Sequence, residues 1–354
     1  MPTLFGKHYT AHELRERVGD MAQLAGITPV TVNGDSADGV RGLEFYTGNG
    51  FRFTVLPDRG MDIAGAEWRG APLAWMGSAG VRHPAFHEPQ GIGFLRGFFG
   101  GLLTTCGLSN VGVPNDDQGE HYGLHGRINH LPAHQVSYSA DWQGDEYVLT
   151  ARGKMRETRL FGENLLLSRT ITTKLGSDSV LIEDTIENQG FEPAPVMILY
   201  HINAGFPVLD EGSELLIRSQ ITPRDEEAHQ GLDRALRGDR PLPGFKEQVH
   251  IHTVETESDG WAAAALVNPQ FDGGAGIGLC VRYRPDQLPY FMEWRMVGQG
   301  AYVMGLEPAN CSVMGRAGER REGRLEVLAP GQRKAVQVEI RAVTSRGEID
   351  RLRG

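Results

Sequence analysis

The sequence has few cysteines and no long apolar run. Its three cysteines, Cys106, Cys280 and Cys311, lie far apart, are odd in number and form no CxxC pair. This usage fits buried thiols in a reducing compartment better than a disulfide framework. No segment approaches the roughly 20 apolar residues of a membrane helix, and the N-terminus has no apolar stretch of signal-peptide length. We therefore predict a cytoplasmic protein.

Positive charge is also scarce. Lysine and arginine number 35 against 45 aspartates and glutamates, which gives a formal net charge of −10. Nucleic acids and anionic membranes are bound by basic faces, so we predict that neither is a partner. No P-loop or nucleophilic-serine elbow occurs. The glycine-rich stretch 273–278 precedes a strand-like run rather than a helix, so it is not a nucleotide-binding loop.

Glycine is in excess, with 47 residues among 354, which is about twice the usual share and indicates many tight turns. The dominant apolar period is two: in residues 51–55, for example, Phe51, Phe53 and Val55 alternate with polar side chains. Similar runs lie at 147–152, 165–175, 179–187, 196–201, 277–283, 290–296, 301–306 and 334–343. Strands separated by turn residues at short intervals predict an all-β, antiparallel sandwich or barrel.

One helix is expected near the N-terminus. Thr10 and Glu13 have the spacing of a capping box, and Gly26 can end the helix. Its apolar face would consist of Leu14, Val18 and Met21. We predict a helical extension at residues 1–38 followed by one domain at 39–354. Residues 224–244, rich in charge, glycine and proline, are expected to form a surface excursion that can close over a site.

Three short segments each place one ionisable side chain beside an apolar run. They are Gly123–Arg127, Leu199–Asn203 and Gly305–Asn310, and the side chains are His125, His201 and Glu307. A carboxylate in such a position is costly to bury without a partner or a raised pKa. Two imidazoles and a carboxylate are sufficient to deliver a proton to one oxygen while removing one from another. We predict acid-base chemistry, and expect Pro308 to end the last strand.

The histidines also have interpretations other than a catalytic role. A histidine that ends a buried strand, as His201 does, is often a core residue. Four histidines crowd one stretch, namely His121, His125, His130 and His134, and a metal site there is an alternative because histidine is a versatile ligand. However, Gly123 and Gly126 interrupt any helix, and the spacing matches no known ligand pattern, so we predict no metal and place His130 and His134 in a solvated loop.

Two further side chains are candidates for substrate binding. Arg96 lies among glycines and phenylalanines, where a guanidinium can either pair with a carboxylate or hold hydroxyl or phosphate oxygens. Trp294 offers a flat apolar face that suits a sugar ring, although packing in the core is the slightly stronger expectation for a tryptophan there.

These segments together resemble the galactose mutarotase superfamily, and in particular its aldose 1-epimerase-like proteins, over roughly residue 39 to the end. Residues 55–70 resemble the early strands, and residues 95–98 the segment that supplies an arginine in the hexose-phosphate epimerase branch. Residues 124–127 are similar to the first-histidine segment, Tyr200-His201 to the second, and residues 306–308 to the late Glu-Pro segment.

The resemblance implies a large twisted β-sandwich of the supersandwich type and a cofactor-independent mutarotase acting on a small carbohydrate. In that mechanism Glu307, as a carboxylate, takes a proton from the anomeric hydroxyl, and His201, as an imidazolium, protonates the ring oxygen. His125 and Arg96 would hold hydroxyls, and Arg127, Asn203 and Trp294 complete the expected binding set. The aspartate that contacts hydroxyls in these enzymes has no secure match, and Asp225, Asp239 and Glu247 remain open.

Two other functions stay open from the sequence. A sugar-binding or regulatory protein would keep the pocket without the chemistry, and a metal-dependent sugar isomerase would use the histidine cluster at 121–134. Whether the sugar is phosphorylated is also open, because Arg59, Arg96 and Arg127 can locally outweigh the acidic balance.

Overall fold

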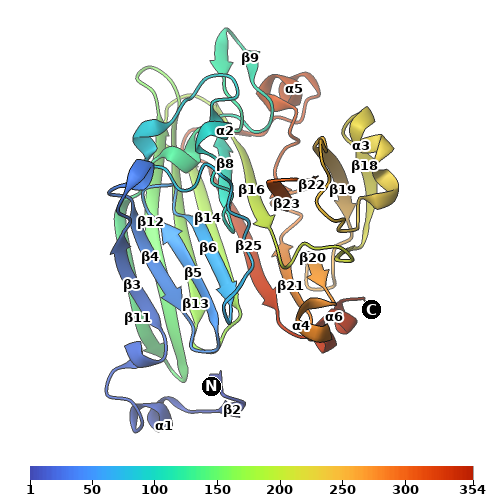
Figure 1. Cartoon of the computed structure of the whole chain (residues 1–354). Helices are drawn as coiled ribbons and strands as arrows, with labels where there is room; N and C mark the ends of the chain where they lie inside the picture. Colours follow the sequence, from blue (N-terminus) through green and yellow to red (C-terminus); the bar gives the residue numbers. More distant parts are fainter. Residues whose placement is uncertain (354) are drawn as a thin grey trace.

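Antiparallel sheets dominate the computed structural model, which describes residues 1–353 (Figure 1). The largest sheet has eight strands in the order β11-β12-β13-β14-β25-β21-β20-β17. Their bounds are β11 (His134–Gln143), β12 (Glu146–Thr158), β13 (Asn164–Lys174), β14 (Ser179–Asn188), β25 (Arg333–Val343), β21 (Ile277–Tyr283), β20 (Ala262–Asn268) and β17 (Glu214–Ile217). The all-β prediction is confirmed.

Two further sheets face this one. The six-stranded sheet contains, in order, β18 (Ser219–Pro223), β19 (Gln248–Val254), β22 (Tyr290–Gly298), β23 (Ala301–Ala309), β16 (Met197–Ala204) and β8 (Thr104–Leu108). The five-stranded sheet contains β3 (Gly26–Thr31), β4 (Arg41–Tyr46), β5 (Phe51–Leu56), β6 (Asp62–Trp68) and β7 (Ala71–Pro72). A bridge between Ile63 and Leu103 connects the two sheets. One buried apolar cluster draws side chains from all three sheets, which makes the architecture a sandwich.

The remaining elements are short. Two-stranded ribbons pair β1 (Thr3–Leu4) with β2 (Lys7–His8), β9 (Asn115–Asp117) with β10 (Glu120–Tyr122), and β15 (Ala194–Pro195) with β24 (Val327–Leu328). The helices are α1 (Ala11–Arg15), α2 (Phe94–Gly97), α3 (Glu226–Gln230), α4 (Phe271–Gly274), α5 (Gly315–Arg321) and α6 (Arg346–Arg353), with single 3₁₀ turns at Met21–Gln23, Asp35–Ala37, Pro84–Phe86, Ile128–His130 and Leu232–Arg234. Within residues 1–353, none of these helices has the length and apolar character to cross a membrane.

Residue alternation explains why these segments form strands. In β13, Leu165, Leu167 and Ile171 are buried, while Ser168 and Thr170 between them are partly exposed. Their inward side chains meet the buried Phe45 and Phe53 of the five-stranded sheet in one apolar cluster. A period of two fits a pleated strand with one buried face, so the sequence pattern and the burial pattern agree.

The N-terminal segment departs from the predicted helical extension. The capping box of Thr10 and Glu13 is present, but α1 ends at Arg15. Asp20 then caps a separate 3₁₀ turn, because its side chain accepts a hydrogen bond from the Ala22 backbone. From Gly26 the chain is β3, an edge strand of the five-stranded sheet, so the helical description of residues 1–38 is wrong beyond this point.

The three cysteines are buried and free, as the sequence predicted. The excursion at residues 224–244 connects β18 with β19 and contains α3 and a 3₁₀ turn. It lies beside the six-stranded sheet (Figure 1).

Candidate functional site

A cavity of about 440 Å³ lies against the six-stranded sheet, and His125, His201 and Glu307 all line it. The three come from a loop, from β16 and from β23, which are distant in sequence. The volume lies within the roughly 300–1,000 Å³ of small-molecule sites. A larger cavity of about 800 Å³, between residues 158–165 and 188–195, has no histidine in its lining.

Strand pairing places His201 beside Glu307. The antiparallel register of β16 and β23 pairs Leu199 with Ala309 and Ile202 with Leu306, so His201 faces Glu307 across the two strands. The His201 Nε2 atom lies 3.2 Å from the Glu307 Oε1 atom, although the two are not aligned as a hydrogen bond. The strand continues to Ala309, so the prediction that Pro308 ends it is wrong. Pro308 removes one backbone donor at this point of the ladder.

Gly305 makes room for the carboxylate. It lies two residues before Glu307 on the same face of β23, and a Cβ atom there would lie 2.4 Å from Glu307 Oε1. Any side chain at position 305 would therefore displace the carboxylate. The glycine of the Gly305–Asn310 segment has a specific steric function at the site.

His125 lies in a loop and has φ 56°, a left-handed conformation that is uncommon for a residue with a Cβ. The backbone N–H of Gly112 donates to His125 Nδ1 over 3.3 Å, and the backbone N–H of His125 donates to the Gly112 carbonyl. Since Nδ1 accepts, the proton of the neutral ring is on Nε2. Burial lowers the pKa of His125 to about 4, so the ring is neutral at pH 7 and Nε2–H is a donor.

Burial also shifts the pKa values of Glu307 and His201. It raises the pKa of the Glu307 carboxyl well above its ordinary value, and Glu247 adds to the shift while Arg224 opposes it. Burial, and then the nearby His125, lower the pKa of His201 to about 3. Burial therefore favours the neutral form of both groups. Desolvation thus opposes the expected carboxylate and imidazolium, and their mutual attraction must offset it.

Aromatic rings form the walls beside this pair. The ring of His201 packs at 5.1 Å from Trp294 and 5.0 Å from Phe98, and Trp75 lies at 6.2 Å from Trp294. Trp294 therefore lines the cavity as expected. Trp75 and Phe98 were missed, because a single aromatic residue in a turn-rich segment carries no sequence signal for a site.

A second carboxylate belongs to the cavity. Glu247 lines it, accepts a hydrogen bond from Trp294 Nε1 over 2.9 Å, and lies 3.4 Å from Arg224 Nη2, which also lines the cavity. Of the three carboxylates that the sequence left open, Glu247 alone lines it. Asp225 caps α3, and Asp239 pairs with Arg234 and Arg295.

Three of the expected binding residues do not line the cavity. Arg96 has a 71% exposed side chain and pairs with Glu88 over 3.2 Å. Arg127 is exposed outside the lining. Asn203 is buried, and its Nδ2 atom donates to the carbonyls of Gly101 and His201. Side-chain direction caused these errors, since proximity in sequence does not fix which way a side chain points.

The four clustered histidines do not converge. His121 is exposed and bound to Asp116, and His134 is exposed at the start of β11. His130 is 5% exposed, so its predicted place in a solvated loop is wrong. Among residues 1–353, no group of three or more histidine, cysteine, aspartate or glutamate side chains is arranged to hold a metal ion.

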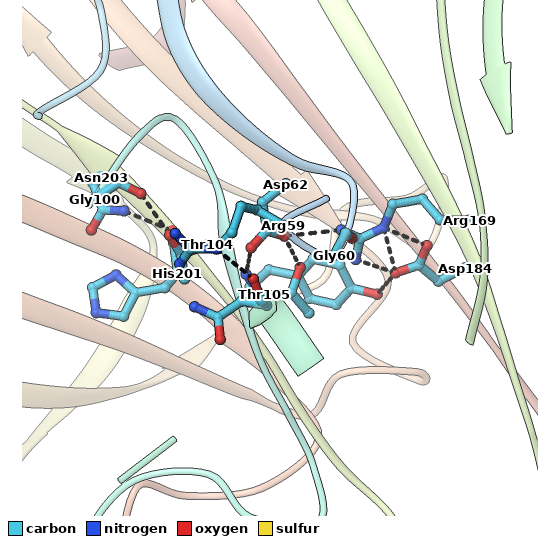
Figure 2. Close-up of polar contacts among 12 residues, drawn as sticks. Arg59, Gly60, Asp62, Gly100, Thr104, Thr105, Arg169, Asp184, His201 and Asn203 are labelled. Atoms are coloured by element: carbon cyan, nitrogen blue, oxygen red, sulfur yellow. Dashed lines mark hydrogen bonds and ion pairs between the residues drawn. The ribbon is translucent and has the colours of Figure 1, made fainter. Parts of the chain in front are cut away.

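A buried polar network lies behind His201 (Figure 2). Asp62 accepts hydrogen bonds from the backbone and hydroxyl of Thr105, and Arg169 joins Asp62 to Asp184. The hydroxyl of Tyr200, the neighbour of His201, donates to Asp184 over 2.6 Å. Thr105 pairs with Tyr200 in the β8–β16 ladder. The network therefore fixes both strands beside His201.

The fold is a galactose mutarotase-like β-sandwich. The structure is similar to that of a protein from Klebsiella pneumoniae proposed to be an aldose 1-epimerase, with TM-score 0.86, 26% identity, and 92% of this chain and 85% of that chain covered. A galactose mutarotase-like protein from Clostridium acetobutylicum has TM-score 0.61 and 11% identity, covering 91% and 99% of the two chains. Galactose 1-epimerase from Lactobacillus acidophilus has TM-score 0.58 and 12% identity, also covering 91% and 99%.

Residues 37–342 match the family described as domain of unknown function DUF4432, and the chain belongs to that family. No curated protein matches the sequence. The resemblance to the mutarotase superfamily is thus confirmed at the level of the fold.

Proposed function

We propose that this protein is a cofactor-independent aldose 1-epimerase that interconverts sugar anomers by acid-base ring opening. The observation that carries the proposal is the close approach of Glu307 and His201, 3.2 Å apart at the buried wall of a cavity. A carboxyl group and an imidazole whose pKa values are both shifted by burial are typical of acid-base sites.

The reaction requires one proton to pass from the Glu307 carboxyl to the His201 imidazole. The polar groups of a bound sugar make the charged forms less costly, and this transfer produces a carboxylate and an imidazolium without net uptake of a proton. The pair then has the two protonation states that ring opening requires.

Ring opening conserves protons. The Glu307 carboxylate takes the proton of the anomeric hydroxyl, the imidazolium of His201 donates its proton to the ring oxygen, and the C1–O5 bond breaks as the carbonyl forms. Rotation about the C1–C2 bond and the reverse transfers close the ring with the other configuration. His125 Nε2–H is a neutral donor for a sugar oxygen, where it can stabilise developing negative charge.

The rest of the cavity suits a monosaccharide. Trp294, Trp75 and Phe98 present apolar surface for the C–H faces of a sugar ring, and Glu247, held by Trp294 and Arg224, can accept hydroxyl protons. The similarity to the Klebsiella protein proposed to be an aldose 1-epimerase, and to galactose 1-epimerase in fold, supports the same reaction class.

Saturation-exchange NMR tests the proposal on a panel of free and phosphorylated aldoses. The wild-type protein should accelerate exchange between anomers of at least one sugar, and Glu307→Gln should reduce the rate by about 10²–10⁴-fold. Glu157→Gln is the matched control, because Glu157 is another buried glutamate, bonded to the Leu108 backbone and outside the cavity lining.

Other outcomes discriminate the alternatives. Sugar binding without exchange would indicate a binding or regulatory protein that lacks the reaction. Equal exchange rates for wild type and Glu307→Gln would refute the assigned base. Activity that is lost to a chelator and restored by a metal would favour a metal-dependent isomerase.

A further inference from the structure

A second polar cluster lies on the other side of Phe94, whose ring is 5.1 Å from the His125 ring and 6.3 Å from that of His130. At its centre is Arg59, which is completely buried. Its guanidinium donates to three backbone carbonyls, those of Asn129 (2.9 Å), Arg82 (2.8 Å) and Gly97 (3.0 Å). Within residues 1–353 it forms no ion pair with a carboxylate, which is unusual for a buried cation.

The carboxylates of Asp58, Asp62 and Glu88 are bound elsewhere. Asp58 is held by the backbone and guanidinium of Arg41, and Glu88 pairs with Arg96. Asp62 accepts hydrogen bonds from Thr105 and Arg169. Burial consequently lowers the pKa of Arg59 to about 10, against the opposing charge of Asp62. The cluster has a surplus of positive charge in a chain whose net charge is −10.

Hydrogen-bond directions leave an amide donor free. Arg59 Nη2 lies 3.2 Å from His130 Nε2, and since a guanidinium only donates, Nε2 must accept. The proton of the neutral His130 ring is therefore on Nδ1 and is donated to Asn129 Oδ1 over 2.7 Å. Asn129 is completely buried, and its Nδ2 atom has no hydrogen-bond partner.

Further polar atoms in the same cluster lack partners, and one of the two ring nitrogens of a neutral histidine is a donor. The Nε atom of Arg82 is buried and unpaired, as are both ring nitrogens of His87, which stacks on His130 at 4.0 Å. Burial, and then the charges of Arg127 and Arg59, lower the pKa of His87 to about 4. Arg127 is exposed, and its backbone carbonyl accepts a hydrogen bond from the backbone N–H of His130. Unpaired buried donors are costly unless a ligand satisfies them.

We propose that Arg82, His87, Arg127 and Asn129, around the buried Arg59, bind a small oxyanion, either free inorganic phosphate or the phosphoryl group of a metabolite. A planar guanidinium, an amide and an imidazole offer donors in several directions, which suits an anion with several acceptor oxygens. This site lies outside the lining of the acid-base cavity and does not depend on the proposed epimerase activity.

Thermal unfolding and calorimetry of the full chain test the site with inorganic phosphate and, separately, glucose 6-phosphate, with chloride added to match ionic strength. Phosphate should raise Tm saturably, because a ligand that binds only the folded state stabilises it. Arg82→Met should abolish this increment. Arg96→Met is the matched control, since Arg96 lies in the same segment but is exposed and paired with Glu88.

Asn129→Asp gives a second, independent measurement. The change keeps an oxygen that accepts from His130 and supplies the missing negative charge, so Tm without phosphate should exceed that of the wild type, and phosphate should add nothing further. A response to glucose 6-phosphate alone, lost in Asn129→Asp, would identify a phosphorylated metabolite as the ligand. The proposal is overturned if wild type shows no saturable response to either ligand, or if Arg82→Met and Asn129→Asp respond as wild type does.

Discussion

Tyr200 and His201 are neighbours on β16, yet they belong to two buried polar regions of opposite character. Tyr200 faces the Asp62–Arg169–Asp184 network, in which Arg169 contacts both carboxylates and the tyrosine hydroxyl donates to one of them (Figure 2). His201 faces the cavity, where its Nδ1 atom and the Oε1 atom of Glu307 have no hydrogen-bond partner.

The difference lies in how the buried charge is compensated. In the network, fixed partners hold the charges of Arg169 and Asp184 in place, so the region contributes rigidity and little chemistry. In the cavity, no such partners hold Glu307 and His201, whose Oε1 and Nδ1 atoms make no hydrogen bond. In structural polar clusters the buried polar atoms typically all have hydrogen-bond partners. In sites that act on a ligand, some of these atoms typically lack a partner within the protein.

The largest effect on stability is expected from the network. Arg169→Met removes the cation that contacts both Asp62 and Asp184, and should lower the free energy of unfolding by about 3–5 kcal/mol. Urea denaturation measures this. The control is Lys174→Met, which removes an exposed ion pair with Glu146 and should cost about 0–1 kcal/mol. Equal losses in both variants would show that the network is not a fixed structural unit.

For His201→Gln we expect a large loss of activity and little loss of stability, in contrast to Arg169→Met. The rate of anomer exchange should fall by about 10²–10⁴-fold, because the proton donor is lost. The free energy of unfolding should change by less than about 1 kcal/mol, since His201 is neutral and its Nδ1 atom makes no bond that the change would break. Exchange NMR and urea denaturation of the same sample separate the two. A stability loss as large as that of Arg169→Met would make His201 a structural residue.

The pH dependence of stability should also distinguish the cavity residues from the Asp62–Arg169–Asp184 network. The pKa of His125 is about 4 in the folded protein and about 6.5 in the unfolded chain. Between these values the unfolded state binds more protons, so stability falls as pH decreases from 7 toward 4, by less than about 1.4 kcal/mol per pH unit. His125→Asn tolerates the left-handed backbone and should flatten this slope. Urea unfolding at pH 5, 6 and 7 measures the change, and parallel slopes would contradict it.

Glu307 should give the free energy of unfolding a pH dependence of the opposite sign. Its pKa is raised on folding, so the stability it contributes is complete below the unfolded value of about 4.5 and is lost as pH rises through the folded value. Glu307→Gln should therefore make unfolding less sensitive to pH on the alkaline side. A steeper alkaline loss in this variant would show that the carboxyl is ionised in the folded protein.

A small effect on stability is also expected for Gly305→Ala. The added Cβ would lie 2.4 Å from Glu307 Oε1, and the flexible end of the glutamate can turn aside. We expect a stability loss of about 1 kcal/mol or less and a clear reduction in kcat, because the base is displaced. Gly300→Ala is unsuitable as a control because of its positive φ, whereas Gly65→Ala is suitable, since a Cβ there contacts nothing. An unchanged kcat would show that the carboxylate position is not critical.

Much of the fold could be predicted from the sequence. Alternation in residues 51–55 and 277–283 predicted β5 and β21, and the Thr10–Glu13 capping box predicted the start of α1. These features depend on local geometry, since a period of two and a cap are properties of a few adjacent residues. The strand at Gly26–Thr31 was missed, because its pairing with β4, which begins further along the chain at Arg41, decided it.

The sequence by itself determined the sheet architecture and the three segments that carry His125, His201 and Glu307. Only the tertiary structure decided which side chains meet. It directed Arg96, Arg127 and Asn203 away from the cavity, brought Glu247 and Arg224 into it, and buried Glu307 and His201 so that the neutral form of each is favoured. The physical reason is that desolvation and side-chain direction depend on the elements packed around a residue, which lie far away in the sequence.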